Sequence, residues 1–489
     1  MLYIGIDLGT SAVKLLLMDS KGNIKNIVSK SYPLEMPFPG WSQQNPEDWI
    51  NRTFEGVREL ICNYDSSEIA GIGVGGQMHG LVVLDENDKV LRPAILWNDG
   101  RTAAQTDYLN NIIGRELLCE RTANIAFAGF TAPKLLWMKE NEPELFSKIS
   151  KIMLPKDYIV YMLTGIHSTD VSDASGTLLF DVKNKCWSKE MLDLCGIREN
   201  QMAQIFESYE AVGTLKSEAA QKLGLNASVK IAAGAGDNAA AAVGTATVGE
   251  GGCNISIGTS GTVFISSKKL LTDKLYGLHS FAHADGNFHF LGCILSAASC
   301  NTWWQNKIIG TTDYKGEEAK ITDDMLGENN VFFLPYLMGE RSPHNDPSAR
   351  GAFIGMTMDT SREDMTQAML EGVAFAIRDC VEIAKKAGVD IKRSKLCGGG
   401  AKSRLWRKIF ANVLGIELDI VKSEEGPGYG GAMLAAVACG EYESVSDCAG
   451  KLVQIVDTVM PDKELTEKYE GKYQKFHKIY PSVRGVFKE

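Results

Sequence analysis

The sequence predicts a two-domain α/β protein, and three observations support this class. The chain has 489 residues, of which 44% are hydrophobic, so it can bury more than one core. The run LYIGIDLGTS at its start places an apolar strand before a Gly-Thr-Ser turn, and NISIGTSG repeats that order near the middle. Helical patterns fill much of 100–150 and 365–387. Because VGTATVGEGG reads as a loop, we place the domains at residues 1–247 and 248–489.

The first domain is predicted to open with a β-meander. In LYIGIDLG the apolar side chains alternate, AVKLLLMD follows the turn, and SKGN separates it from a third apolar run. A further central strand is expected at Gly71–Gly76.

Charge and composition exclude several classes of partner. The net charge is −10 and no Lys/Arg-rich block offsets it, which argues against binding to nucleic acid or to an anionic membrane. No leader-like or membrane-spanning run is recognisable, so we expect a soluble, cytoplasmic protein. The eleven cysteines show no C-x-x-C pair and are expected to be reduced, mostly buried thiols.

The repeated Gly-Thr-Ser turn suits phosphate oxygens. Small residues allow close backbone approach, and the turn offers N–H groups and hydroxyls. Thr10 and Ser11 in the first copy, with Gly258 and Thr259 in the second, are therefore candidate nucleotide-binding residues. The alternative is that each copy is an ordinary hairpin turn.

Asp7 ends an otherwise apolar strand, where burial of a carboxylate is costly without a cation. We interpret it as a carboxylate that holds Mg²⁺ beside phosphates, with Lys14 as a nearby positive charge. The competing interpretation is a strand-end Asp that caps its own turn.

Asp237 lies in IAAGAGDNAAAAVG, between a glycine-containing strand end and an Ala-rich helix. The glycines would let a ligand approach the carboxylate, which favours a general base acting on an attacking hydroxyl. An N-terminal helix cap is the other interpretation, and the two roles can coexist.

Two polar segments are candidates for the acceptor site. Met78 and His79 lie in the glycine-framed loop GGQMHG, and Trp97 begins the group WNDGR. An aromatic, an amide and charged groups suit the hydroxyls and apolar faces of a sugar. A structural ion pair between Asp99 and Arg101 is the alternative.

The late segment SKLCGGGAKSRLW predicts a strand, three glycines and an amphipathic helix. Glycines at such a junction allow adenine or phosphate to lie against the backbone. The spacing fits neither a dinucleotide fingerprint nor a P-loop.

Long stretches resemble the FGGY carbohydrate kinase family. GFTAPKLLWMKEN (129–141) resembles its first signature and GAFIGMTMDTSREDMTQAMLE (351–371) its second. Other stretches resemble the xylulose-phosphorylating members and span nearly the whole chain: GGQMHG, LRPAILWNDGR, MLPKDYIVYMLTG, SDASGT, GDNAAAAVG, FLPYLMGERSPH and CGGGAKSRLWRKI.

The resemblance implies two actin-like (ribonuclease H-like) domains with an interdomain cleft, and transfer of phosphate from ATP to O5 of D-xylulose. Sugar would bind mainly to the first domain and ATP mainly to the second. The GAG before Asp237 differs from the expected GGG and leaves the base in place. By residue, the resemblance implies Asp237 as base; Met78, His79, Trp97, Asp237 and Asn238 at the sugar; Thr259, Gly399, Gly400 and Ala401 at the nucleotide; and Asp7 with Asp237 at Mg²⁺.

Two alternatives stay open at this point. Another family member would phosphorylate ribulose, gluconate, fuculose or glycerol. An actin-like ATPase switch would hydrolyse ATP without a sugar, although it would need neither an acceptor loop nor a base. The oligomeric state to test is a homodimer.

Overall fold

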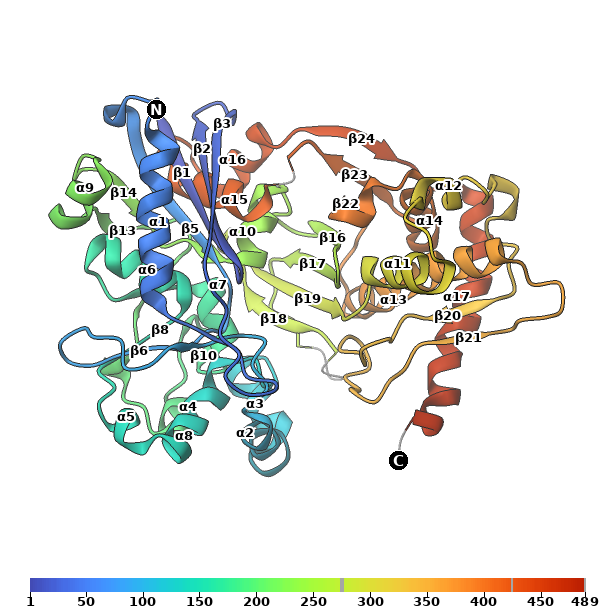
Figure 1. The fold of residues 1–489 in the computed structure, drawn as a ribbon, viewed down its shortest axis with the longest axis horizontal. Coiled ribbons are helices and arrows are strands. Elements are labelled where there is room, and N and C mark those ends of the chain that lie inside the picture. Colours follow the sequence, from blue (N-terminus) through green and yellow to red (C-terminus); the bar gives the residue numbers. More distant parts are fainter. Residues whose placement is uncertain (273–276, 424, 488–489) are drawn as a thin grey trace.

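The computed structural model describes residues 1–272, 277–423 and 425–487. Each half is built around a mixed sheet, and Figure 1 shows the two halves side by side. The sheet of the first half has the strand order β13-β14-β5-β1-β2-β3, with β15 also paired to β5. Its strands are β1 (Leu2–Leu8), β2 (Ala12–Asp19), β3 (Ile24–Ser31), β5 (Ile69–Gly76), β13 (Ala211–Thr214), β14 (Lys230–Ala232) and β15 (Ala235–Gly236).

The second sheet repeats the pairing pattern of the first. Its order is β18-β19-β17-β16-β22-β23-β24. In both sheets an antiparallel meander is followed by two parallel strands and then an antiparallel edge strand. The strands are β16 (Cys253–Ile257), β17 (Gly261–Ser267), β18 (His279–Ala282), β19 (Phe288–Ile294), β22 (Arg393–Cys397), β23 (Glu417–Val421) and β24 (Ile455–Val459).

The predicted elements are confirmed at both hairpins and at the central strand. The first Gly-Thr-Ser turn joins β1 to β2, and the second joins β16 to β17. The two turns differ in detail: Leu8 pairs with Val13 across the first, whereas Ile257 pairs with Gly261 across a shorter second turn. The meander is therefore duplicated with slightly different tips.

Helices cover both sheets and fill the ends of the domains. The segment 100–150 is largely helical, in α2 (Ala103–Asp107), a π-helical turn at 108–114, α3 (Arg115–Thr122), α4 (Thr131–Asn141) and α5 (Pro143–Ser147). Other helices include α1 (Pro46–Ile61), α6 (Pro155–Thr164), α7 (Val171–Ala174), α8 (Lys189–Cys195), α9 (Ser217–Leu223), α10 (Asp237–Gly244), α11 (Ala298–Trp303), α12 (Tyr314–Glu318), α13 (Arg362–Lys386), α14 (Arg404–Leu414), α15 (Gly426–Ala438), α16 (Val445–Leu452) and α17 (Lys463–Val483).

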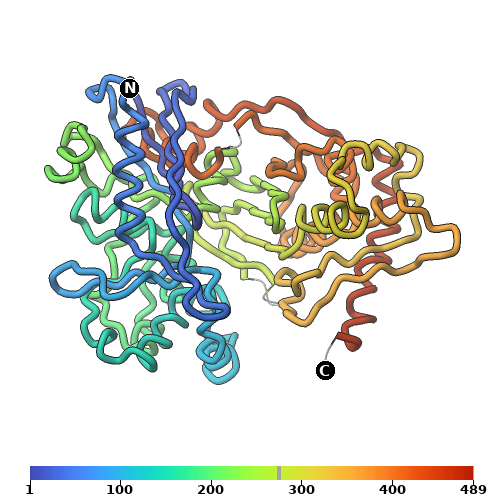
Figure 2. Tube along the Cα trace, viewed as in Figure 1, coloured from blue at the N-terminus to red at the C-terminus, as the bar shows by residue number. Residues whose placement is uncertain are grey.

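The chain returns to the first domain near its end. Helix α15 packs against β1, β5 and α10, and Figure 2 shows this late segment beside the N-terminal strands. A side chain at Gly5 or Gly73 would overlap the carbonyl of Gly428 or Gly431 on that helix. The glycines of the first strands thus permit close helix–sheet packing, because only glycine leaves the backbone uncovered.

The aromatic C-terminal helix packs on the second domain. Tyr469, Tyr473, Phe476 and Tyr480 of α17 are buried in the same core as α13 and β16. Within the described ranges, no helix is both long and apolar enough to cross a membrane.

Candidate active site

Asp7 and Asp237 lie at the same end of the strands of the first sheet, on either side of the end of β5. Gly75 on β5 pairs with Asp7 on one side and with Ala235 on the other. Asp237 follows β15 directly and is the first residue of α10. Two carboxylates that are 230 residues apart in sequence therefore flank one strand end.

Asp237 is not the helix cap that one interpretation predicted. The N-cap position belongs to Gly236, and Asp237 is the first residue of the helix itself. Its Oδ1 instead accepts hydrogen bonds from the backbone N–H of Asn238 at 2.7 Å and from the Nδ2 of Asn238 at 2.9 Å. Asn238 therefore orients the carboxylate from both its backbone and its side chain.

The environment resists ionisation of both carboxyl groups. Burial and, to a lesser extent, the charge of Asp7 raise the pKa of Asp237 to about 7, although hydrogen bonds from Asn238 oppose the shift. Burial raises the pKa of Asp7 to about 6, and Lys14 opposes that shift. Hard oxygen ligands with unrelieved negative charge fit Mg²⁺, which takes one or two carboxylates and keeps several waters. In the described part of the chain, no group of three or more metal-ligating side chains lies together.

His79 is held in one orientation in the acceptor loop. Its backbone is left-handed, with φ at 68°, and its Nδ1 lies 2.7 Å from the carbonyl of Gly176. Burial and, to a lesser extent, the charge of Lys134 lower its pKa to about 3, so the ring is neutral. A carbonyl accepts only, so Nδ1 carries the proton and Nε2 is left as an acceptor for a ligand hydroxyl. Met78, the neighbouring residue, has its Sδ 4.0 Å from Asn238 Nδ2.

The supports of His79 were not identified from the sequence. Its ring stacks on Phe130 at 4.6 Å between centroids, and its carbonyl accepts from Lys134 Nζ at 2.7 Å. Phe130 and Lys134 belong to the segment 129–141, which resembled a family signature, and a buried Lys is costly unless it has such partners. That signature thus builds the wall behind the acceptor loop.

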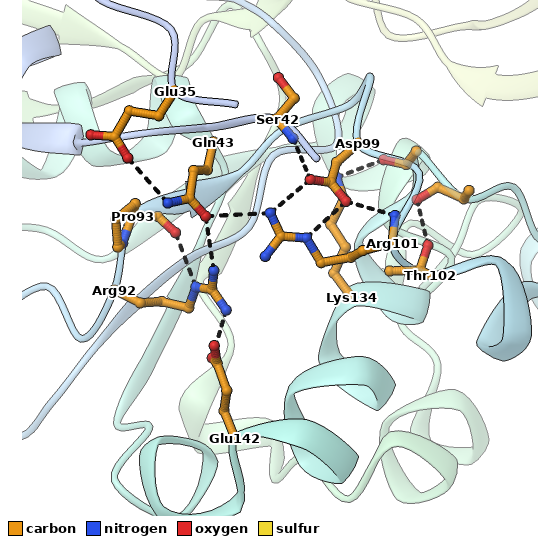
Figure 3. A network of polar contacts seen from close by, with 12 residues as sticks. Glu35, Ser42, Gln43, Arg92, Pro93, Asp99, Arg101, Thr102, Lys134 and Glu142 are labelled. Carbon is orange, nitrogen blue, oxygen red and sulfur yellow. Dashed lines mark hydrogen bonds and ion pairs between the residues drawn. The ribbon is translucent and has the colours of Figure 1, made fainter. Parts of the chain in front are cut away.

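The structure separates the members of WNDGR. Trp97 is 43% exposed and its indole N–H donates to Thr10 Oγ1 at 3.0 Å, so it faces the site. The side chains of Asp99 and Arg101 are fully buried and joined by a 2.7 Å ion pair. Figure 3 shows this pair within a network that also includes Gln43. Asp99 and Arg101 therefore form a buried structural ion pair, as the alternative interpretation predicted.

A cavity of about 320 Å³ lies between the two halves, and a second one of about 410 Å³ lies near the β2–β3 turn. Asn238 lines the cavity between the halves from the first half and Gly398 and Gly399 from the second. The cavity therefore connects the loop of Asp237 to the predicted nucleotide loop. Further lining residues, which sequence reasoning missed, include Asn254, Ser256, Thr262, Cys397, Lys402 and Ser423.

The nucleotide loop is only partly exposed to this cavity. Gly399 has open space where a side chain would stand, so a ligand can approach its backbone. Gly400 and Ala401 are buried, and Gly400 lies against Ile257 and Trp406. These two residues shape the loop from beneath.

The hairpin tips differ in their surroundings. Thr259 is exposed, whereas Thr10 takes part in hydrogen bonds with Trp97 and Gln77. Lys14 forms a 2.9 Å ion pair with Glu425 from the second half, so contact with phosphate would require that pair to open.

Transfer of a phosphoryl group to a small acceptor needs a base beside a cavity that can hold a nucleotide. This site has a carboxylate beside a glycine-lined cavity between two domains, so the fold and the site together define a kinase. The sequence models of the FGGY family of carbohydrate kinases match residues 2–244 with the N-terminal domain and 253–439 with the C-terminal domain. The chain belongs to this family and is a carbohydrate kinase.

Relatives of the chain match over its whole length. A xylulose kinase of Bacillus subtilis is 38% identical and covers 99% of this chain and 97% of its own. The crystal structure of a xyloylose kinase from Brucella ovis is 39% identical, with a TM-score of 0.95 over 99% of this chain and all of that one. A gluconate kinase from Lactobacillus acidophilus is 27% identical, with a TM-score of 0.94 over 99% of this chain and 98% of that one.

Proposed function

We propose that the protein transfers the γ-phosphoryl group of ATP to O5 of D-xylulose, with Asp237 as the general base. The observation that carries this proposal is the position of Asp237, at the edge of the cleft and directly before Asn238, which lines the cavity. The xylulose kinases among the full-length relatives support the choice of sugar.

Asp237 accepts the proton of the O5 hydroxyl as this oxygen attacks the γ-phosphorus in line. A pKa of about 7 matches this role, because a base works best when its pKa lies near the operating pH. Asn238 holds one oxygen of the carboxylate and leaves the other to the substrate. His79 Nε2 and Trp97 position the sugar.

The residues at the cleft also balance the charge of the triphosphate. Asp7 and Asp237 are the groups that would hold Mg²⁺, whose charge neutralises phosphate oxygens when it is bound. The tips at Thr10 and Ser11 and at Gly258 and Thr259 donate hydrogen bonds to those oxygens, and Gly399 lies against the nucleotide. Enclosing the phosphates in this way excludes water, the competing nucleophile.

The test is ADP release from Mg-ATP with D-xylulose, D-ribulose, L-fuculose, gluconate, glycerol and no sugar. We expect rapid release with D-xylulose alone. Preference for gluconate, a substrate that the Lactobacillus neighbour makes a second candidate, would move the proposal to another sugar of the family. Release without any sugar would contradict a base that acts on an acceptor hydroxyl.

Asp237→Ala tests the base itself. Turnover should fall by on the order of 10²–10⁴-fold because the proton acceptor is removed, whereas sugar binding should fall only modestly because His79 and Trp97 remain. Sugar affinity is measured by quenching of tryptophan fluorescence. Near-normal turnover would end the assignment of Asp237.

A further inference from the structure

A fully buried group of charges lies behind the loop of Asp237. Lys156, at the start of α6, has no exposed side-chain surface, and its Nζ lies 2.6 Å from Asp157 and 2.8 Å from Asp170. Asp173 lies 4.0 Å from the same nitrogen, and neither of its carboxyl oxygens has a hydrogen-bond partner. We call these four residues the buried charge group.

Burying these four ionisable side chains costs more free energy than a purely structural element usually requires. Burying an ion pair often stabilises a fold less than apolar residues of the same volume would. Burial raises the pKa of Asp173 well above its usual range, with Lys156 opposing and the other two carboxylates adding to the shift. Burial lowers the pKa of Lys156, but the carboxylates override this and keep it charged.

The buried charge group touches the backbone on both sides of the site. A Cβ atom added at Gly76 would lie only 2.8 Å from the Cβ of Lys156, so the two backbones pack closely. Gly76 ends β5 just before the acceptor loop. On the other side Asp170 Oδ2 accepts from Ser172 Oγ at 2.6 Å, and this Oγ accepts from the backbone N–H of Gly236 at 3.1 Å. Gly236 immediately precedes Asp237.

Ser172 is thus the last side chain in a short series of contacts that leads from Lys156, through Asp170, to the peptide before the base. Lys156 fixes Asp170, whose carboxylate fixes the hydroxyl rotor of Ser172 so that a lone pair meets the Gly236 N–H. A hydroxyl that donates to a carboxylate is a stronger acceptor for a second hydrogen bond. The peptide before Asp237 is held by this acceptor.

We propose that Ser172, backed by Asp170 and Lys156, is a positioning residue that sets the orientation of the Asp237 carboxylate during phosphoryl transfer. The inference rests on the proposed role of Asp237 as base. It assigns a function to the segments SDASGT and MLPKDYIVYMLTG, which resembled the family without a stated role.

Ser208 supplies a matched control. It is as fully buried as Ser172, and its Oγ donates to the same Asp170 Oδ2 at the same 2.6 Å. The N–H of Gly236 donates to Ser172 Oγ and not to Ser208, whose carbonyl accepts from the N–H of Gly234 at 3.1 Å. Ser172→Ala and Ser208→Ala therefore remove the same hydrogen bond to Asp170, and only the first removes the acceptor of Gly236.

The experiment compares the two variants in kcat, in KM for both substrates, in the pH profile of kcat/KM and in thermal unfolding. Ser172→Ala should lower kcat by about tenfold, which is the rate equivalent of one lost hydrogen bond. The KM for ATP should be unchanged, and the acid limb of the pH profile of kcat/KM should be displaced. Ser208→Ala should keep kcat and the pH profile and lose comparable thermal stability. An equal effect on kcat in both variants, or none in either, would overturn the proposal.

A double-mutant cycle separates this inference from the proposed function. If Ser172 acts through Asp237, Ser172→Ala should change the residual rate of Asp237→Asn by less than twofold, because coupled sites are not additive. A further tenfold loss in that background would contradict action through Asp237. If Asp237→Asn alone turns over at nearly the rate of the unaltered enzyme, the assignment of Asp237 as base is refuted. If Asp237→Asn is inactive but Ser172→Ala has a normal kcat, only the role proposed for Ser172 is refuted.

Discussion

The indole N–H of Trp97 donates a hydrogen bond to Thr10 Oγ1 over 3.0 Å, which joins the proposed sugar site to the tip of the first hairpin. The Thr10 hydroxyl in turn donates to Gln77 Oε1 at 3.2 Å, and Gln77 directly precedes Met78 and His79. Gln44 Nε2 holds the carbonyl of Thr10 at 2.6 Å. The hairpin tip and the acceptor loop therefore have a common set of hydrogen bonds.

Trp97→Phe should reduce kcat/KM for both substrates by about three- to tenfold, because it keeps an aromatic face and removes one hydrogen bond to Thr10. Steady-state kinetics with each substrate varied in turn check this. Trp187→Phe is the control, since its indole N–H donates to the carbonyl of Ala203 away from the site. A loss confined to the sugar KM would argue that Trp97 acts on the sugar alone.

The pH profile of kcat/KM should rise with pH and level off above about 7, because Asp237 must be deprotonated to accept a proton and its pKa is about 7. Asp7→Asn removes the charge that adds to burial in raising this pKa, so its acid limb should move to lower pH. Measuring kcat/KM from pH 5 to 9 gives the acid limb of both the unaltered enzyme and the Asp7→Asn variant. An unmoved limb would show that Asp7 does not act on the titrating group.

Asp7→Asn should also stabilise the protein without ligands at pH 8. The pKa of Asp7 is about 6 in the folded protein and about 4 in the unfolded chain. The stability that Asp7 contributes to the folded protein is therefore fully present below about pH 4 and is lost as the pH rises through about 6. Removing the charge should recover roughly 1–3 kcal/mol at pH 8, and the gain should vanish below about pH 4. Urea unfolding at both pH values tests the sign, and a gain of equal size at both would count against it.

Thr259→Ala should raise KM for ATP severalfold and leave KM for the sugar unchanged, because the exposed hydroxyl at this tip is proposed to meet a phosphate oxygen. Thr214→Ala, an equally exposed Thr at the end of β13, serves as the control. Unaltered nucleotide kinetics in Thr259→Ala would contradict the hairpin clamp.

Sugar binding should close the cleft, because aligned tips and exclusion of water both require the two halves to approach. Small-angle scattering with and without saturating D-xylulose should show a smaller radius of gyration in the bound protein. Identical profiles would contradict closure, and a sugar that elicits no ADP release provides the control.

Much of the fold and part of the site followed from local sequence patterns. Alternating apolar residues around each Gly-Thr-Ser turn predicted both hairpins, and the glycines before Asp237 predicted a carboxylate at a strand end. Sequence spacing left open whether Asp237 capped its helix, since both interpretations require an Asp at that point. The structure places Gly236, and not Asp237, at the N-cap position.

The sequence by itself determined the duplicated strand–turn–strand units, because side-chain alternation and turn chemistry act between residues a few positions apart. Only the tertiary structure decided that Asp99 and Arg101 are buried, that α15 returns to the first sheet, and that Ser172 reaches the peptide before Asp237. Each of these depends on contacts between distant segments. Burial and hydrogen-bond partners arise when separate elements pack, and no local period encodes which elements meet.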